Sequence, residues 1–433
     1  MSDESKKLDE AVDQALLNYE NSHPKSLEIH QQACNYMPGG NTRTVIWHEP
    51  FPLRIVEAQN AEIVDAEGNR YVDFLGEYTA GLFGHSHPSI QAATREALDG
   101  GTNFGAHNHY EARFSQLLCE RFPAIERLRF TNSGTEATMM ALSVSRYFTG
   151  REKVLVFRGG YHGGVFYFGQ KNSPINAPFP WIVAPFNNFE ATRAIMQSEG
   201  DSIACVLVEP MQGSSGCITA DPEFLKALRQ SCDDIGALLI FDEVMTSRTG
   251  AGGAAAHFGV TPDLMTLGKY LGGGHSFGSF GGRADIMGLF DPSRNDALVH
   301  AGTFQNNVMT MRNGIEVLEA IYTSEMAEAH YQLGEQWRSG LNRMLLGLES
   351  EFQVIGMGSL LCLHPVRGAI RSLEDLKSAD DRLRLLLFMG LLNEGYYIAR
   401  RGFMSLSLVL QESHFRGFEN ALEKVVRQIE SIS

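Results

Sequence analysis

Short apolar runs alternate with longer amphipathic segments through the middle of the chain. Two of these runs, 204–208 and 237–241, contain apolar residues only, which is typical of strands covered on both faces in a mainly parallel sheet. The runs at 127–131 and 153–157 predict two further strands, and the proline and glycine that bound 88–100 predict a helix. This alternation of strands and helices predicts an α/β fold.

The two ends of the chain carry a different pattern. The N-terminal region predicts a helix over about 8–36, broken at His23-Pro24 and followed by short strands. These strands are expected at 52–56, 61–65 and 71–74. A helix-rich stretch begins near Met311, and further C-terminal elements follow it. They are expected at 380–393 (helix), 396–399 and 404–409 (strands), and from about 415 (helix). The tail is therefore expected to form a smaller α+β domain.

Composition and charge exclude several classes of protein. The 433 residues carry a formal net charge of −15, so there is no electrostatic basis for binding nucleic acid or an anionic membrane. The six cysteines are scattered, without a CxxC pair or a metal-ligand spacing, which indicates reduced thiols rather than disulfides or a zinc site. No apolar run is long enough to span a bilayer, and the N-terminus lacks the pattern of a signal peptide. We expect a soluble cytoplasmic protein.

The segment 130–137 joins the end of a predicted strand to the start of a helix. Backbone N–H groups at a helix N-terminus, assisted by the hydroxyls of Ser133 and Thr135, can form a seat for a phosphate group. The same residues also match an ordinary capping box, which needs no ligand. This segment alone leaves both interpretations open.

Two more features follow, each at the end of a predicted strand. A glycine-rich loop at 159–164 would let the backbone approach a flat ligand, on which Tyr161 could stack. Glu209 and Asp242 end apolar strands, where doubly wound sheets bind ligands. A carboxylate such as Asp242 can pair with a protonated pyridine nitrogen. A strand-ending aspartate can also simply cap a turn.

Lys269 stands between an apolar strand and the glycine run 272–274. A partly buried lysine has a lowered pKa, and its neutral amine is the form that Schiff-base chemistry needs. A single lysine in a loop is more often solvated, but here it completes a set. A phosphate seat, a stacking ring, a carboxylate and a lysine occur in this order, and together they supply what pyridoxal 5'-phosphate (PLP) catalysis asks of a protein.

With these motifs the chain resembles the class III aminotransferases of PLP fold type I over nearly all of its length. The matching motifs are Asn132-Ser133-Gly134-Thr135-Glu136-Ala137, Gly160-Tyr161-His162-Gly163, Phe241-Asp242-Glu243-Val244 and Gly268-Lys269 with the glycines that follow. The resemblance implies that Lys269 carries PLP and moves the proton, and that Asp242 pairs with the ring nitrogen. It implies a cofactor site formed by Ser133, Gly134, Thr135, Tyr161, His162, Glu209, Asp242, Met245, Lys269 and Thr303. Thr303 would reach the phosphate of the other subunit, which implies a homodimer.

The resemblance also implies the domain organisation. We expect a large domain with a mainly parallel, doubly wound, seven-stranded sheet, and a small α+β domain built from the N-terminal segment and the C-terminal part. The chain then divides into the N-terminal segment 1–67, the large PLP-binding domain 68–311 and the C-terminal small domain 312–433.

Within this family the chain looks closest to aromatic β-amino acid aminotransferases of the β-phenylalanine type, and it is related to glutamate-1-semialdehyde aminomutases. Aminomutases usually have a proline where Ser276 stands. Arg43 and Arg401 match the two arginines that bind carboxylates in the β-phenylalanine enzymes, and arginine forms bidentate hydrogen bonds with such groups. Arg400 beside Arg401 leaves that assignment open by one position. The side-chain pocket is expected to be lined by Tyr78, Phe83 and Met245.

The expected reaction is a two-step exchange. A β-amino acid, expected to be aromatic, gives its amino group to the cofactor, and an oxo acid, expected to be 2-oxoglutarate, takes the group up again. Three alternatives remain: an aminomutase-type isomerase, a transaminase for another amine, and a PLP-binding protein without catalysis. The histidines within 85–87 and 107–109 lack a ligand set at metal-binding spacing, so we expect structural roles for them and no metal.

Overall fold

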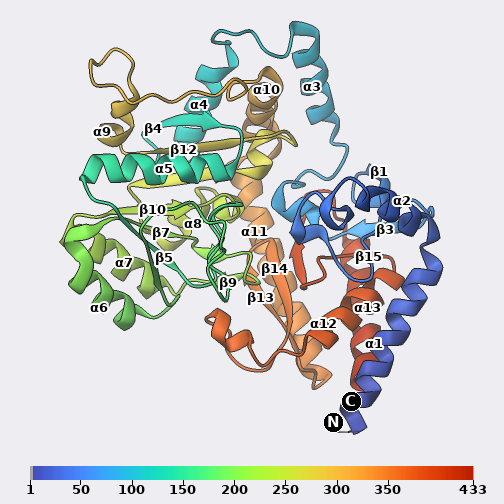
Figure 1. Ribbon diagram of the computed structural model, residues 1–433. Helices are drawn as coiled ribbons and strands as arrows, with labels where there is room; N and C mark the ends of the chain where they lie inside the picture. Colours follow the sequence, from blue (N-terminus) through green and yellow to red (C-terminus); the bar gives the residue numbers. More distant parts are fainter. Residues whose placement is uncertain (1–2, 433) are drawn as a thin grey trace.

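The computed structural model describes residues 3–432 and is built around a seven-stranded sheet (Figure 1). The strand order is β4-β12-β11-β10-β7-β5-β6. These strands are β4 (Arg127–Thr131), β5 (Lys153–Phe157), β6 (Trp181–Ala184), β7 (Ile203–Val208), β10 (Leu238–Asp242), β11 (Leu264–Gly268) and β12 (Gly278–Gly282). Neighbours pair in parallel except at β12, which is antiparallel to both β11 and β4. The predicted mainly parallel sheet is confirmed.

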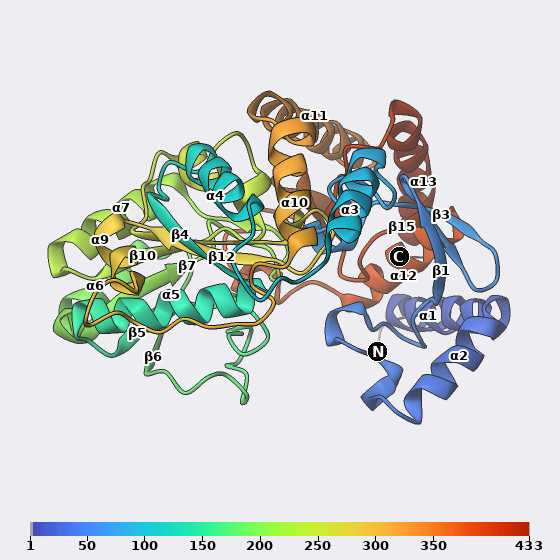
Figure 2. The ribbon, with the colours of Figure 1, turned by 90° about the horizontal axis from the view of Figure 1, so that it is seen from above.

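Residues of the central strands alternate between two hydrophobic clusters, because successive side chains of a strand point to opposite faces. Val154 and Leu207 pack on the face that is covered by α5 (Gly134–Thr149). Leu155 and Val206 pack on the other face of the sheet, together with residues of the helices that cover that face. Figure 2 shows α5 and α4 (Tyr110–Arg121) on opposite sides of the strands. Helices on both faces explain the uniformly apolar strands and confirm the doubly wound architecture.

The remaining helices connect the strands or belong to the chain ends. They are α1 (Asp3–Ser22), α2 (Pro24–Cys34), α3 (Pro88–Gly100), α6 (Phe189–Glu199), α7 (Pro222–Ile235), α8 (Gly253–Phe258), α9 (Ala284–Met287), α10 (Val308–Glu316), α11 (Ser324–Gly347), α12 (Asp381–Asn393) and α13 (Glu412–Glu430). Within residues 3–432, none of the helices combines the length and the apolar character that crossing a bilayer requires.

The two ends of the chain share one hydrophobic cluster and one sheet. Leu8 and Phe74 pack in the same cluster as Trp337 and Phe418. The sheet has the order β1-β2-β3-β15, with β1 (Ile55–Gln59), β2 (Glu62–Asp65), β3 (Arg70–Asp73) and β15 (Tyr396–Tyr397). The C-terminal β15 pairs in parallel with the N-terminal β3, and Figure 1 shows the blue and red parts side by side. The expected small α+β unit from both ends is confirmed.

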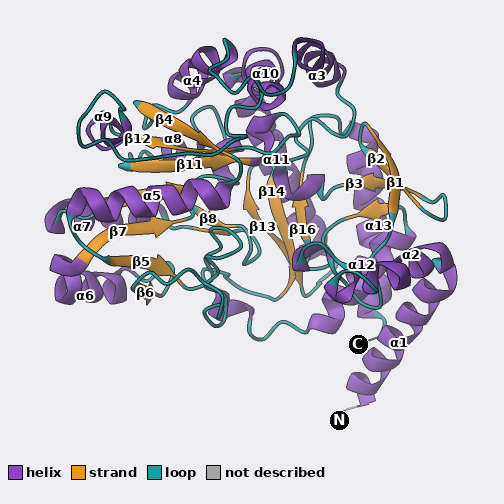
Figure 3. Cartoon of the chain, turned by 45° about the horizontal axis from the view of Figure 1, so that its top comes forward, coloured by secondary structure: helices purple, strands orange, loops and turns teal. Residues whose placement is uncertain are grey.

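Several strands were not predicted from the sequence pattern. A three-stranded sheet, β13-β14-β16, lies between the other two sheets in Figure 3. Its strands are β13 (Phe352–Met357), β14 (Leu360–Pro365) and β16 (Phe403–Ser405), and a short pair is formed by β8 (Met211–Gln212) and β9 (Ile218–Thr219). Of these, β16 overlaps the strand expected at 404–409 but is shorter. The central strand β12 was also missed because it is rich in glycine. A Cβ at Gly278 would lie 2.1 Å from the carbonyl oxygen of Ser133, so glycine lets this strand approach the start of α5.

Candidate active site

A cavity of about 490 Å³ opens at the carboxyl ends of the central strands. Because β4 and the parallel strands run in one direction, Thr131, Asp242 and Gly268 end at the same edge of the sheet. The predicted site residues that line the cavity are Arg43, Ser133, Gly134, Thr135, Tyr161, His162, Glu209, Asp242, Met245 and Lys269. Residues far apart in the sequence are thus brought together where this class of sheet binds ligands.

Lys269 follows directly on β11 and has a left-handed backbone conformation, with φ of 56°. Such a conformation is uncommon for a residue with a side chain, and it occurs at functional sites where the surroundings hold it. Burial, with the positive charge of Arg43 as a further cause, lowers the pKa of the Lys269 ammonium to about 8. A substantial share of the amine is therefore neutral near physiological pH, as a nucleophile requires.

Asp242 and His162 form a buried pair at the bottom of the cavity. Asp242 Oδ2 lies 2.8 Å from His162 Nδ1, and Asp242 Oδ1 accepts hydrogen bonds from Thr266 Oγ1 and from the Val244 backbone, both at 3.1 Å. These contacts orient the carboxylate. The sequence analysis assigned His162 to the cofactor site, but it did not predict the contact between its ring and Asp242.

Glu209 joins the end of β7 to the glycine-rich loop. Its carboxylate accepts hydrogen bonds from the backbone N–H of Tyr161 at 2.9 Å and of Gly213 at 3.2 Å. Burial, partly opposed by the charge of His162, raises the pKa of Glu209 to about 7. The loop is held in place through its backbone, and the ring of Tyr161 remains 44% exposed. An exposed ring fixed at its backbone is suited to stack on a flat ligand.

The start of α5 is both a capped helix end and a possible anion seat. Ser133 is the N-cap and accepts a hydrogen bond from the Glu136 backbone at 3.2 Å, while Glu136 accepts one from the Asn132 backbone at 3.0 Å. Thr135 Oγ1 accepts a hydrogen bond from the Gly164 backbone at 3.3 Å, which ties the glycine-rich loop to the helix. The first backbone N–H groups of a helix have no hydrogen-bond partner within the helix and can bind an anion. In α5 this end of the helix lines the cavity. Capping and phosphate binding are therefore compatible here.

Arg43 and Arg401 both lie on the ring of Tyr78. The distances from the guanidinium carbons to the ring centre are 5.9 Å and 5.2 Å. In residues 3–432, neither arginine forms an ion pair with an acidic side chain, and Arg401 Nε has no hydrogen-bond partner. Arg400 differs, because it contacts both Glu49 and Asp381 at 2.7 Å. Of these three arginines, the two without an ion pair in the described residues are therefore Arg43 and Arg401.

Four predicted site residues lie outside the cavity lining: Tyr78 and Arg401, described above, and Phe83 and Thr303. Phe83 is 3% exposed and packs in the core, with its ring centre 6.5 Å from that of His87. Thr303 lies in the exposed segment 301–304 and does not line the cavity that contains Lys269. The expected role of Thr303 depends on a second subunit, so its exposure here is compatible with that role.

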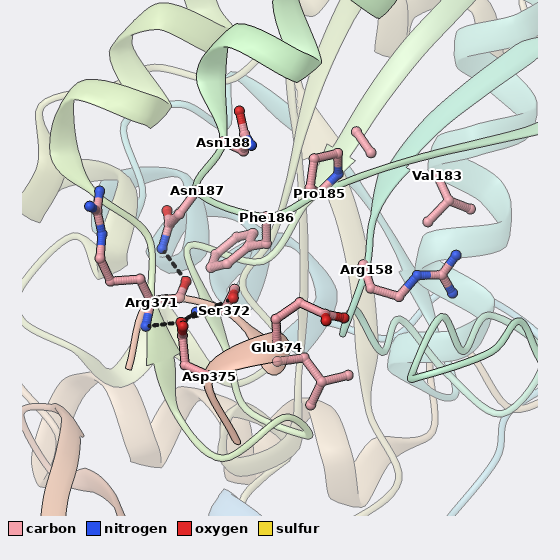
Figure 4. Close-up of a pocket in the computed structure, with 12 residues that line it drawn as sticks. Arg158, Val183, Pro185, Phe186, Asn187, Asn188, Arg371, Ser372, Glu374 and Asp375 are labelled. Carbon is pink, nitrogen blue, oxygen red and sulfur yellow. Dashed lines mark hydrogen bonds between the residues drawn. The ribbon is translucent and has the colours of Figure 1, made fainter. Parts of the chain in front are cut away.

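A larger cavity of about 560 Å³ lies elsewhere, between the β6–α6 connection and the segment 371–375 (Figure 4). Asn187 Nδ2 donates a hydrogen bond to the backbone oxygen of Arg371, and Asp375 accepts bonds from the Arg371 and Ser372 backbones. Among the described residues that line it, Arg158 is a further cation, but none is a lysine that could carry a Schiff base. The chemistry is therefore placed in the cavity that contains Lys269.

The residues around Lys269 fit PLP. A depressed-pKa amine, an oriented buried carboxylate, an exposed ring on a backbone-anchored loop and a helix N-terminus meet in one cavity. These are the groups that bind the aldehyde, the ring nitrogen, the ring face and the phosphate of this cofactor. Fold and site together define a PLP-dependent enzyme.

Comparison with known proteins gives the family. The family model described as aminotransferase class-III matches residues 45–366, so this chain belongs to the class III aminotransferases and is a PLP-dependent transaminase. It is 51% identical to the β-phenylalanine transaminase of Variovorax paradoxus over 94% of this chain and 93% of that protein. It is 34% identical to the glutamate-1-semialdehyde 2,1-aminomutase of Methanothermobacter thermautotrophicus, over 93% and 99% of the two chains.

Solved structures agree with this assignment. The crystal structure of a β-phenylalanine aminotransferase from Variovorax paradoxus has a TM-score of 0.96 with this chain at 49% identity, and 98% of each chain is covered. An ω-transaminase from Sphaerobacter thermophilus has a TM-score of 0.88 at 32% identity, with 94% of this chain and 98% of that chain covered. The predicted family and fold class are confirmed.

Proposed function

We propose that this transaminase moves the amino group of an aromatic β-amino acid, of the 3-amino-3-phenylpropanoate type, to 2-oxoglutarate. One observation carries the proposal: Arg43 and Arg401 both lie over the ring of Tyr78, and neither has an acidic partner in residues 3–432. Two unpaired guanidinium groups suit a donor and an acceptor that each bring a carboxylate to one site. The 51% identity to a β-phenylalanine transaminase supports the class of donor.

We assign the chemical roles to residues of the cavity. When bound, PLP supplies an electrophilic carbon and a ring that withdraws negative charge from the reacting carbon. Lys269 holds the cofactor and, in its neutral form, accepts the proton of the amine-bearing carbon. Asp242, oriented by His162 and Thr266, keeps the proton on the ring nitrogen. The cofactor contacts assigned to Ser133, Gly134, Thr135, Tyr161, Glu209 and Met245 rest on their common cavity.

The two arginines have different proposed substrates. In a β-amino acid the amine lies one carbon further from the carboxylate than in an α-amino acid, so the two substrates need separate anchors. Arg43, on the N-terminal segment, is assigned to the β-acid, and Arg401 to the distal carboxylate of 2-oxoglutarate. The ion pairs of Arg400 with Glu49 and Asp381 support Arg401 rather than its neighbour. Tyr78, Phe83 and Met245 are assigned to the side-chain pocket.

The active unit is proposed to be a homodimer in which Thr303 reaches the phosphate of the other subunit. The apolar side chains of Val299 and Phe304 are 88% and 58% exposed, and large exposed apolar groups mark contact surfaces. We retain the division into 1–67, 68–311 and 312–433 as a proposal. The cluster that joins both chain ends supports a common small unit, and it also includes Tyr71 and Phe74, just beyond residue 67. A cytoplasmic location is also proposed, and the six cysteines of the described chain, none in a disulfide, agree with it.

A half-reaction tests the donor. The enzyme with PLP but without acceptor is mixed with each enantiomer of 3-amino-3-phenylpropanoate. We expect one enantiomer to remove the visible absorption of the lysine-bound cofactor, and 2-oxoglutarate to restore it. If another oxo acid restored this absorption and 2-oxoglutarate did not, the proposed acceptor would be rejected and the proposed donor would stand.

The same assay separates the alternative functions. A cofactor band that neither enantiomer changes would reject the aromatic β-amino acid donor, and glutamate-1-semialdehyde and other amines would then be compared. Conversion of glutamate-1-semialdehyde without any added oxo acid would identify an aminomutase. The relative with that activity shares 34% identity with this chain, against 51% for the β-phenylalanine transaminase, so the transaminase is preferred.

A further inference from the structure

A left-handed turn carries Tyr78, whose ring contacts both of the arginines that we assign to carboxylates. Gly76, Glu77, Tyr78 and Thr79 have φ of 53°, 49°, 52° and 85°. Three consecutive residues with side chains in this region are strained, and such strain persists only where the surroundings hold it. The first position requires glycine, because a Cβ at Gly76 would lie 2.5 Å from the backbone oxygen of Ser405.

The turn is held at its beginning by Asp73. Asp73 Oδ1 accepts hydrogen bonds from the Leu75 backbone at 2.8 Å and from the Gly76 backbone at 3.0 Å. Asp73 Oδ2 lies 2.9 Å from His85 Nε2. These contacts explain how the chain enters the turn, but they do not hold Tyr78 or Thr79.

The end of the turn is held by Arg248. Its side chain is 1% exposed and, within residues 3–432, it has hydrogen-bond acceptors but no acidic partner. Arg248 Nη1 donates to the Thr79 backbone oxygen at 3.4 Å and to Ser405 Oγ at 2.8 Å, and Nη2 donates to the Leu406 backbone oxygen. Arg248 Nε donates to Ser359 Oγ at 3.1 Å. A buried cation without a counter-ion is costly, so its retention here calls for a reason.

Arg248 belongs to the large domain, three residues after the cavity residue Met245. Its acceptors lie far from it in the sequence: Thr79, at the end of the turn, is 169 positions away, and Ser405, in β16, which begins with Phe403, is 157 positions away. The Tyr78 ring stacks on Phe403 with ring centres 5.8 Å apart, and the Tyr78 hydroxyl donates to the Val45 backbone oxygen at 2.7 Å. One guanidinium group therefore links the turn that carries Tyr78 to the strand that follows Arg401, and Tyr78 in turn bonds the segment that carries Arg43.

We propose that Arg248 is a positioning residue, which holds the strained turn so that Tyr78 sets the spacing of the two carboxylate-binding arginines. Arg248 does not contact substrate or cofactor. The inference rests on the proposed function, because it takes Arg43 and Arg401 as the carboxylate sites. The role requires the fork of N–H donors of the Arg248 guanidinium group, since a lysine at this position cannot reach acceptors on several sides at once.

The first test is Arg248→Lys in the holoenzyme. We measure kcat, KM for 2-oxoglutarate, and the inhibition constant of 3-phenylpropanoate, a carboxylate without an amine. We expect KM and the inhibition constant to rise about tenfold or more, with kcat reduced less than about threefold and the cofactor absorption unchanged. A purely structural role would lower the fraction of active enzyme and leave both constants unchanged.

A matched pair of serine variants keeps the test decisive if Arg248→Lys does not fold. Ser405 and Ser359 are 0% and 1% exposed, and each accepts one hydrogen bond from Arg248. Of the two, Ser405 lies next to the turn, since a Cβ at Gly76 would come within 3.4 Å of its hydroxyl oxygen. Ser405→Ala should raise both constants, whereas Ser359→Ala should leave them as in the parent enzyme. Unchanged constants in Ser405→Ala and in any folded Arg248→Lys would overturn the inference.

Arg401→Gln in the same assays separates this inference from the proposed function. If Arg401→Gln leaves KM for 2-oxoglutarate unchanged, the assignment of the carboxylate site is wrong, and the positioning role is rejected with it. If Arg401→Gln raises KM and the Arg248 and Ser405 variants do not, the carboxylate site stands and only the positioning role is rejected.

Discussion

Asp242 Oδ2 and His162 Nδ1 lie 2.8 Å apart, and the two side chains are 5% and 3% exposed. The pair joins the end of β10 to the glycine-rich loop, so Asp242, which we propose to face the ring nitrogen, is oriented by the loop that carries Tyr161, the proposed stacking ring. The two functions are structurally coupled, because a displacement of the loop also removes a hydrogen bond from Asp242.

Replacement of His162 by alanine tests this coupling. Without the imidazole, Asp242 keeps its bonds from Thr266 and Val244 but loses the one that restrains Oδ2. Loss of such an orienting partner typically lowers activity about ten- to a hundredfold, and we expect this fall in kcat with the cofactor still bound. The control is His257→Ala, at an exposed histidine that contacts Tyr331. A kcat equal to that of the parent in His162→Ala would reject the role of the pair.

The pKa of Lys269 predicts how cofactor uptake depends on pH. Burial and Arg43 lower this pKa to about 8, and only the neutral amine attacks the aldehyde of PLP. Uptake by the apoenzyme should therefore increase with pH and reach half its maximal rate near pH 8. Arg43→Gln removes a positive charge that disfavours the ammonium form, so its midpoint should lie at higher pH.

Stopped-flow absorbance over a pH series measures both midpoints. Arg400→Gln is the matched control, since Arg400 is neutralised by Glu49 and Asp381. Its midpoint should coincide with that of the parent. A midpoint that is unchanged or lower in Arg43→Gln would show that Arg43 does not act on Lys269.

The neighbouring arginines 400 and 401 should differ sharply in their effect on the acceptor. A hydrogen-bonded charged pair contributes about 1.5–3 kcal/mol, and 1.4 kcal/mol corresponds to about tenfold in affinity. Arg401→Gln should therefore raise KM for 2-oxoglutarate about ten- to a hundredfold. Arg400→Gln should leave it unchanged, because that side chain already binds two carboxylates. If steady-state kinetics showed a higher KM for 2-oxoglutarate in Arg400→Gln and an unchanged KM in Arg401→Gln, the acceptor carboxylate would be assigned to Arg400 instead.

Much of this site could be predicted because its residues end strands whose composition is unambiguous. Strands buried on both faces become continuous apolar runs, so the positions of Glu209, Asp242 and Lys269 at strand ends follow from the runs before them. Parallel strands then bring these ends to one edge. The order of the motifs along the chain did the rest, since each supplies a different part of the same cofactor site.

Other features could not be predicted because they depend on distances between residues far apart in the chain. His162 meets Asp242 across 80 positions, and Arg248 meets Ser405 across 157. The sequence around a histidine or a buried arginine does not indicate which distant residue it will contact. The strands β12 and β13 were missed for a local reason, since glycine lowers strand propensity in β12 and β13 follows directly on a long helical stretch.

Two adjacent glycines in the cofactor loop make a stringent test of the loop geometry. Gly163 has φ of 126°, and a Cβ there would lie 2.4 Å from Thr135 Oγ1. At Gly164 a Cβ would meet no atom within 4 Å. Gly163→Ala must push the loop away from the start of α5, which displaces Tyr161 and opens the phosphate seat. Its dissociation constant for PLP, measured by titration of the apoenzyme, should rise about tenfold or more, since backbone strain of roughly 1–3 kcal/mol opposes binding.

Gly164→Ala is the matched control. This variant keeps the N–H that binds Thr135 and should bind PLP like the parent. Equal affinity in both variants would mean that the approach of Gly163 to Thr135 does not shape the site, and an equal loss in both would point to the whole loop rather than to this contact.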